Sequence, residues 1–254
     1  RTCLRDKNAI KEVLKIDIVY RRSSNTYAID EENNDEFQED VFDHLLLVEA
    51  YRAVKGKKNI MLFEQRKSRG LHWLSGLVHA ITHQKVITLN YTKFWEGVSH
   101  KKVLEPYAVK EFKNRWYLLA HEKNDDKYFI KTFGLDRISD LEIAPSTFKP
   151  KKYDAGKDFE NSFGIISTLD EVPQEIIISF DVDQGNYVKT LPFHSSQEIL
   201  IDDDQEFRIK LTLVPTYDFE REILSKGSSF KIISPESFKK SMRKEVEEML
   251  NNFK

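Results

Sequence analysis

Near the middle of the chain, the stretch NRWYLLAHE has the alternating pattern of a β-strand. Because strand side chains point to alternate faces, Arg115, Tyr117 and His121 would share one face. Trp116 and Leu118 would share the opposite, apolar face. A guanidinium group binds phosphate oxygens in pairs, and aromatic rings stack on nucleobases. The strand therefore indicates a core on one side and, on the other, side chains that could hold a phosphate-bearing ligand.

A second candidate for chemistry is the set of three histidines in GLHWLSGLVHAITHQK, namely His72, His79 and His83. Their spacing places them along one stripe of a helix, where two histidines at i and i+4 can chelate zinc. The stripe has no partnering cysteine or carboxylate, and the aliphatic residues beside it define an ordinary packing face. We therefore expect histidines at the edge of a core and no metal site.

His194 stands next to Ser195 and Ser196, and a histidine beside serines could indicate a hydrolase. A catalytic serine needs a positioned base and an acid partner, commonly at a sharp turn between a strand and a helix. No such turn motif or ordered acid accompanies these residues. We predict a protein that is not an enzyme and that binds no cofactor.

The bulk composition is that of an ordinary globular protein, with 32% charged and 40% hydrophobic residues. At 254 residues the chain can form one large domain or two smaller ones. No stretch approaches the roughly 18 apolar residues of a membrane span, and the amino end does not resemble a signal peptide. The single cysteine, Cys3, can form no internal disulfide. We expect a cytoplasmic protein without membrane contact.

The net charge of the chain is −2, but charge is distributed unevenly along it. Residues 1–22 carry +4 and residues 85–153 carry +5, whereas residues 23–84 carry −3 and residues 154–254 carry −8. Positive regions attract phosphates. Any contact with nucleic acid is therefore expected in the first and third of these four regions.

The amino-terminal part predicts a partial winged helix-turn-helix over residues 1–30. RTCLRDKNAIKEVLK has apolar residues at near-helical spacing, with Thr2 available as a helix cap. The strand IDIVY from Ile16 to Tyr20, the polar turn RRSSN and a returning strand TYAI follow. Helix, strand, turn and strand form the second half of a winged helix.

The opening RTCLRD resembles the start of the recognition helix in bacterial regulators, whose usual form is Arg-Thr-aliphatic-x-Arg-Asp. This resemblance implies that Arg1, Thr2 and Arg5 face DNA from the helix. It also implies that Arg21 and Arg22 contact phosphates from the wing. The two helices that precede a recognition helix are not in this sequence, so we expect the natural protein to be longer.

Residues 31–84 predict a helical linker. The acidic run DEENNDEFQED comes first, and VFDHLLLVEAYRAVKGKK then shows helical spacing that should end near Gly56. The stretch GLHWLSGLVHAITHQK forms a further helix. From Lys85 the pattern changes to strands, in the order KVITLNY, KKVLEPYAVKEF, NRWYLLAHE, KYFIKTFGL and DRISDLEI. Such short consecutive strands predict a small, strongly bent antiparallel sheet or barrel.

RWYLLAHE followed by FIKTFGLDRI resembles the WYL domain, which is named for its Trp-Tyr-Leu. Further marks are Tyr91 at the end of the first strand, Pro106 in the second and Asp136-Arg137-Ile138 near the end. The resemblance implies an Sm-like, SH3-type barrel that acts as a ligand-sensing module in bacterial transcriptional regulators. Nucleotides or nucleic-acid pieces are the ligand class usually considered there.

The resemblance also implies a ligand-binding cleft on the mixed face of the strand. Its expected residues are Tyr91, Arg115, Tyr117, His121, Lys131 and Arg137. The family tends to have arginine at the position of Lys131. Simple alternation puts Lys131, Phe133, Leu135 and Arg137 on one face, so the two charged residues can face the cleft while the two apolar ones are buried only if the strand is bulged.

The last third of the chain predicts strands and helices in the order β-α-β-β-α-β, which is ferredoxin-like. A final helix, PESFKKSMRKEVEEML, begins with Pro235 in its first turn. This part resembles the extension that commonly follows WYL domains, including the stretch PFHSSQEI with His194 and Gln197. In those regulators the extension tends to take part in dimer contacts or in placing the DNA-binding domains.

Together these features predict an α+β protein with a WYL barrel over residues 85–150 and a ferredoxin-like domain over residues 174–254. The resemblance implies a homodimeric, ligand-responsive transcriptional regulator whose barrel senses a nucleotide or nucleic acid and whose winged helix binds DNA. Two alternatives stay open. One is a module that holds single-stranded nucleic acid or a protein partner without operator binding, and the other is a nucleic-acid-processing enzyme.

Overall fold

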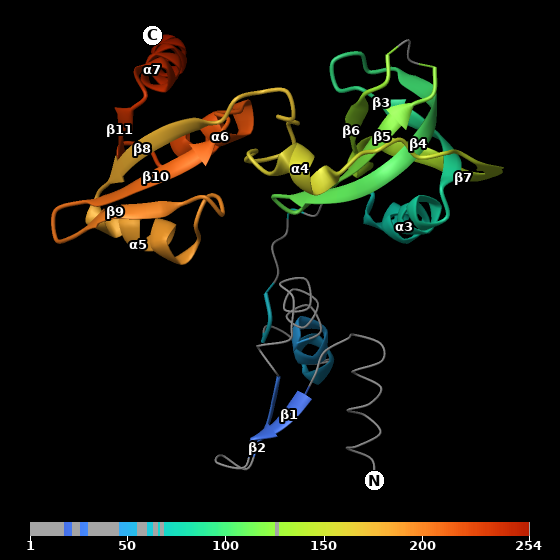
Figure 1. Ribbon diagram of the computed structural model, residues 1–254, viewed down its shortest axis with the longest axis horizontal. Coiled ribbons are helices and arrows are strands. Elements are labelled where there is room, and N and C mark those ends of the chain that lie inside the picture. The colour runs from blue at the N-terminus through green and yellow to red at the C-terminus, as the bar shows by residue number, and fades with distance from the viewer. Residues whose placement is uncertain are drawn as a thin grey trace. The chain divides into compact units, whose positions relative to one another are not determined.

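A computed structural model describes residues 18–21, 26–29, 46–54, 60–62, 66, 69–124 and 127–253 (Figure 1). The chain divides into two compact units, residues 1–66 and residues 67–254. Within the described ranges, no helix has both the length and the apolar character needed to cross a membrane.

The first unit contains the predicted hairpin. β1 (Ile18–Arg21) pairs antiparallel with β2 (Thr26–Ile29). A helix covers residues 46–53, within the stretch predicted to be helical, and its expected end near Gly56 lies outside the described residues. The predicted recognition helix, with Arg1, Thr2 and Arg5, also lies outside them, as does Arg22, whereas Arg21 ends β1. The hairpin is thus confirmed, and the winged helix stays a prediction.

The second unit begins with a helix on a five-stranded antiparallel sheet. The sheet has the strand order β6-β5-β4-β3-β7. A 3-10 turn, η2, leads into helix α3, and a second one, η3, joins β6 to β7. The bounds are η2 Leu71–Trp73, α3 Leu74–Thr82, β3 Lys85–Thr92, β4 Ser99–Phe112, β5 Arg115–Glu122, β6 Ile130–Gly134, η3 Leu135–Arg137 and β7 Ile138–Thr147.

The predicted barrel is not closed. β7 returns to pair with β3, but among the described strands no ladder joins β7 to β6. A closed barrel needs a hydrogen-bonded ladder between every neighbouring pair of strands. β6 has only five residues, and the 3-10 turn that follows it separates the two strands. The sheet therefore bends around its core and stays open at this seam.

The core of this sheet follows the predicted alternation along β5. Leu118 and Ala120 are fully buried, together with Leu77 and Ala80 of α3, and Trp116 packs against the same cluster. The alternation fails after β6 for a different reason from the expected bulge. η3 begins directly after Gly134, so the side chains beyond that residue no longer follow the strand period.

A second antiparallel sheet forms the carboxyl-terminal part, with strand order β11-β8-β10-β9 (Figure 1). Its elements follow one another as β-α-β-β-α-β, as predicted, and a final helix follows. Asp181 and Thr216 cap α5 and α6 through their side-chain oxygens. The bounds are β8 Gln174–Phe180, α5 Val182–Thr190, β9 Glu198–Asp202, β10 Phe207–Leu213, α6 Tyr217–Leu224, β11 Phe230–Ser234 and α7 Glu236–Asn251.

The turn between β4 and β5 contacts the carboxyl-terminal part. Lys113 and Asn114 both have positive φ, as a two-residue hairpin turn requires. Nζ of Lys113 lies 2.6 Å from Oε2 of Glu222 on α6, and Nζ of Lys226 lies 2.7 Å from Oε1 of the same carboxylate. Burial raises the pKa of Glu222, but hydrogen bonds from the two lysines outweigh it and hold the pKa below its usual range.

Two helical glycines differ in the space around them, and this difference gives a stability test. A Cβ atom at Gly185 of α5 would collide with the Cβ of Phe207, whereas one at Gly76 of α3 would lie 3.9 Å from its nearest neighbours. We expect Gly185→Ala to lower the free energy of unfolding by about 1–3 kcal/mol through overpacking. Gly76→Ala should raise it by up to about 1 kcal/mol, because alanine favours helix. Urea unfolding measures both, and equal effects would contradict the close packing of α5.

Candidate functional site

The structure separates the six predicted ligand-binding side chains into two groups along β5. Tyr117 lies opposite Gly134 of β6 and His121 lies opposite Ile130, so the two groups are four residues, or about 13 Å, apart. The first group contains Tyr91, Arg115, Tyr117 and Arg137. His121 and Lys131 lie at the other end of β5, but Lys131 is opposite Ala120 and therefore on the other face of the sheet from His121, contrary to the predicted shared cleft.

Arg137 is the centre of the first group. Its guanidinium carbon lies 5.1 Å from the ring centroid of Tyr91 and 4.8 Å from that of Phe94. A cation over an aromatic face is stabilised by about 0.5–2 kcal/mol. The Nε atom of Arg137 is buried and has no hydrogen-bond partner, and no carboxylate among the described residues forms an ion pair with this side chain. A buried donor without an acceptor is uncommon in proteins.

Gly134 makes room for this arrangement. A Cβ atom there would lie 2.7 Å from a carboxylate oxygen of Asp136 and 2.9 Å from Nη2 of Arg137. Glycine at position 134 therefore lets the side chains of Asp136 and Arg137 lie close over the backbone, and a larger residue there would have to displace their ends. Asp136 in turn lies 3.3 Å from Nη1 of Arg115, whose side chain is 54% exposed. Arg115 thus forms an ion pair at the surface, and Arg137 contacts two aromatic rings.

Tyr91 contributes an uncharged aromatic ring to the group. Its ring belongs to the core beneath the sheet, and its hydroxyl oxygen accepts a hydrogen bond from the backbone N–H of Gly134 at 3.2 Å. Burial raises the pKa of Tyr91, although nearby Arg137 opposes the shift. The phenol therefore stays protonated at neutral pH and fixes the start of the turn that carries Arg137.

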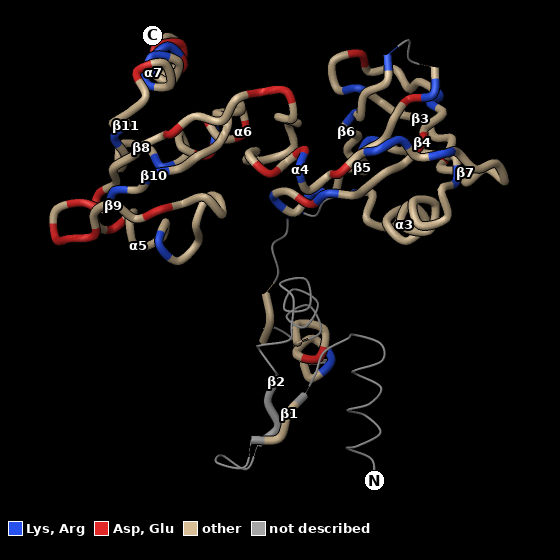
Figure 2. Tube along the Cα trace, in the orientation of Figure 1, with Lys and Arg blue, Asp and Glu red and all other residues tan. Residues whose placement is uncertain are grey.

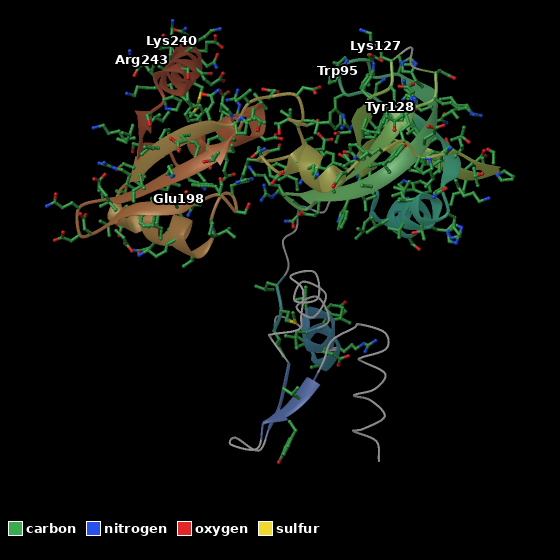
Figure 3. The ribbon with its side chains drawn as sticks, in the orientation of Figure 1. Trp95, Lys127, Tyr128, Glu198, Lys240 and Arg243 are labelled. Carbon is green, nitrogen blue, oxygen red and sulfur yellow. The ribbon has the colours of Figure 1, made fainter. Side chains whose placement is uncertain are left out.

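Two aromatic residues in the loop between β3 and β4 were missed in reasoning from the sequence. Phe94 lies beside Arg137, and Trp95 follows it in the chain (labelled in Figure 3). Their side chains are 67% and 78% exposed. Exposed rings beside a cation form a surface on which a nucleobase can stack. The available signal was the pair of large aromatic letters in a polar turn, KFWEG, where no core was expected.

The second group is engaged in contacts of its own. Lys131 lies 2.8 Å from Oε2 of Glu122, whose other oxygen lies 2.6 Å from Nζ of Lys102. His121 is 8% exposed, and its ring lies 4.3 Å from that of Tyr128. Burial raises the pKa of Glu122, but the two lysines outweigh it and hold the pKa below its usual range. Lys131 thus belongs to an ion-pair group and His121 to a ring contact, and the two lie on opposite faces of the sheet.

Between the two groups, the face expected to line a cleft is covered by the segment after β7. Tyr117 and Leu119 are 8% and 1% exposed. Lys110, which lies opposite Tyr117, has its Nζ 4.8 Å from the ring centroid of Phe159, and burial lowers the pKa of Lys110. Thr132 donates a hydrogen bond to the carbonyl oxygen of Ile165 at 3.3 Å. The accessible part of the site is therefore the end near Arg137.

The histidines considered for chemistry have structural contacts. The Nδ1 atom of His83 lies 2.9 Å from the carbonyl oxygen of His79, and within the described ranges no three potential metal ligands cluster. His194 accepts a hydrogen bond at Nδ1 from the backbone N–H of Ser196, and its Nε2 lies 2.9 Å from the carbonyl oxygen of Glu160. The hydroxyl of Ser196 donates to the carbonyl oxygen of Thr212. His194 thus ties its loop to the preceding segment.

This histidine predicts a pH dependence of stability. Burial lowers the pKa of His194, so the unfolded chain takes up a proton at a higher pH than the folded chain. The stabilisation is complete above the unfolded pKa of about 6.5 and is lost as the pH falls through the folded pKa. We expect His194→Gln to reduce the fall in melting temperature between about pH 7.5 and pH 5. Parallel melting curves for the two proteins would contradict this role.

Comparison with known proteins places these features in a family. A family model for the WYL domain matches residues 72–143, and one for the WCX domain matches residues 173–250. No curated protein matches the chain. Several solved structures also match, and the chain covers less than two thirds of the length of each of the two described below.

The first of these structures is proteasome accessory factor B/C (PafBC) of Arthrobacter aurescens, at 16% identity and a TM-score of 0.36. The match covers 95% of this chain and 39% of that one. The second is described as a CRISPR Cas-related protein, at 12% identity and a TM-score of 0.42, with 71% and 51% covered. The two domain matches confirm what the motif around Trp116 predicted: the chain is a WYL-domain protein with a WCX domain behind its WYL domain.

Proposed function

We propose that the chain is part of a ligand-responsive transcriptional regulator, in which the WYL domain binds a phosphate-bearing nucleotide or nucleic acid. In this proposal residues 1–30 form part of a winged helix that binds DNA, residues 31–84 form a helical linker, and the protein acts as a homodimer in the cytoplasm without enzymatic activity. The two domain matches and the positive charge of residues 1–22 and 85–153 support this function.

The observation that carries the proposal is the state of Arg137. Its guanidinium carbon lies 5.1 Å and 4.8 Å from the centroids of two rings, and its buried Nε has no acceptor. An anionic oxygen is the natural partner for such a donor, because hydrogen bonds between two charged groups are about twice as strong as neutral ones. The exposed ring of Trp95 in the neighbouring loop would stack on a base.

Asp136 would regulate access to the second arginine. The pair of Asp136 and Arg115 is partly exposed, and an exposed ion pair contributes only about 0–1 kcal/mol. A phosphate that approaches Arg137 can therefore take over Arg115 at small cost. Movement of Asp136 would then change η3 and the strands that it joins.

The route from the site to the rest of the protein would run through the turn between β4 and β5. β5 carries Arg115 and Tyr117 next to that turn, and Lys113 of the turn contacts Glu222 of α6. We propose that ligand binding shifts the WYL sheet against the WCX domain, which changes the spacing of the paired winged helices and the affinity for an operator.

A second function is favoured by the exposed aromatic residues alone. Phe94 and Trp95 could bind single-stranded nucleic acid in a protein that recognises no operator. Footprinting of double-stranded DNA with the full-length gene product separates the two functions. A protected operator supports the regulator, and binding of single strands without any footprint supports the module.

The ligand site is tested with a short 5′-phosphorylated oligonucleotide and fluorescence anisotropy. Arg137→Ala and Arg115→Ala should each weaken binding about tenfold to a hundredfold, because a charge-assisted hydrogen bond contributes about 1.5–3 kcal/mol. Trp95→Ala should weaken it by a similar factor through lost stacking. Asp136→Asn should tighten binding, because it releases Arg115.

The matched control is Arg208→Ala, which removes an arginine that pairs with Glu206 in the carboxyl-terminal sheet. This variant should bind as the unchanged protein does. Unchanged binding by both the Arg137 and Arg115 variants, with the fold intact by circular dichroism, would refute the site. Loss of binding in all variants including the control would indicate a nonspecific charge effect and would also count against it.

A further inference from the structure

The WCX domain has an open groove between β11 and helix α7. A cavity of about 600 Å³ is lined there by apolar side chains of both elements. A second hollow of about 650 Å³ follows the neighbouring side of α7 and shares lining residues with the first. The apolar lining residues are Phe230, Ile232, Met242 and Val246.

Positive charge surrounds this groove. The two hollows are lined by five basic and two acidic side chains. Lys240 and Arg243 are labelled on α7 in Figure 3, and neither forms an ion pair with any described residue. The basic residues are Lys231, Lys239, Lys240, Arg243 and Lys244. The groove therefore fits a partner that is both apolar and acidic.

The opposite edge of the same sheet carries both acidic and apolar residues. β9 and β11 are the two edge strands, and β8 and β10 lie between them (Figure 1). Residues 198–206 contain five acidic residues and no basic one, and they form the acidic hairpin at the β9 edge (Figure 2). Within it, Ile199 and Leu200 are 51% and 45% exposed. An edge strand with exposed aliphatic residues is prone to pair with another chain.

We propose that the acidic β9 hairpin of one copy of this chain docks into the basic groove between β11 and α7 of a second copy. Ile199 and Leu200 would supply apolar contacts, while the carboxylates of the hairpin would meet Lys240 and Arg243. Addition of a strand at a sheet edge supplies backbone hydrogen bonds, and the charges fix which edges meet.

The two charge patterns lie in one domain and oppose each other, which distinguishes a second copy from other acidic partners. The hairpin carries five acidic residues, and the groove is lined by five basic ones. Nucleic acid is a poorer fit for the groove, because half of its lining residues are apolar and one, Glu247, is acidic. The open face of this sheet also offers charged pairs such as Lys210 with Glu198 rather than rings for stacking.

This interface rests on the homodimer of the proposed function and names its surface, but it requires no ligand. Whether self-association is independent of the ligand site can be tested directly. Arg137→Ala, which should lose the oligonucleotide, should associate like the unchanged protein. Association that disappears in this variant would overturn the assignment to the groove and the hairpin.

The decisive experiment uses two charge-reversal variants of the full chain and sedimentation velocity at low ionic strength. Lys240→Glu/Arg243→Glu alters the groove, and Asp202→Lys/Asp204→Lys alters the hairpin, all at exposed positions. Each variant alone should associate at least about tenfold more weakly than the unchanged chain, because like charges then face each other. An equimolar mixture should form a one-to-one heterodimer, since each variant keeps one intact surface.

The matched control is Lys149→Glu/Lys152→Glu, which reverses two exposed lysines outside both surfaces and should leave association unchanged. Three results would overturn the proposal: an unchanged chain that is monomeric at all concentrations, a variant that associates normally by itself, or two monomeric variants that fail to pair when mixed. Loss of nucleic-acid binding by the groove variant with unchanged self-association would assign the groove to nucleic acid and would overturn it as well.

Discussion

The candidate site depends on the tight turn that joins β6 to β7. Leu135 is fully buried and anchors the turn in the core. A Cβ atom at position 134 would lie 2.7 Å from the carboxylate of Asp136 and 2.9 Å from the guanidinium group of Arg137, so glycine leaves space there for both side chains. Gly70, with a φ of 89°, approaches the carbonyl group of Leu135 so closely that any side chain there would collide with it. The direction of Arg137 is thus set by packing on both sides of the turn, before any ligand is present.

Alternation along β5 was enough to predict which side chains enter the core, because Leu118 and Ala120 obey the strand period. The same rule could not predict the ligand site. Arg137 lies in a 3-10 turn, where the strand period no longer applies, and its ring partner Phe94 comes from a loop that precedes it by many residues. Such a contact depends on tertiary packing, which has no local signal in the sequence.

The covered face of β5 has a related explanation. Tyr117 was predicted to line a cleft because the sequence gives no sign that a later segment packs over it, yet Tyr117 and Leu119 on the same face are both buried. The segment after β7 is polar and contains no strand, so its composition predicts a linker. Phe159 of this segment lies beside Lys110, so the segment covers this face of the sheet. Only the margin of the predicted cleft remains accessible. The proposed ligand site therefore lies at the end that carries the exposed rings.

In the proposed function, the remaining surface would select its ligand by the difference between its two arginines. Arg115 already has a carboxylate partner, whereas Arg137 has a buried donor without an acceptor. A small carboxylate could satisfy one of them and would gain little from the rings. A phosphate has enough oxygens to contact both, and an attached base adds a contact with Trp95 worth about 1–3 kcal/mol. Affinity should therefore rise when phosphate and base belong to one molecule, because the loop between β3 and β4 and the turn between β6 and β7 then bind it together.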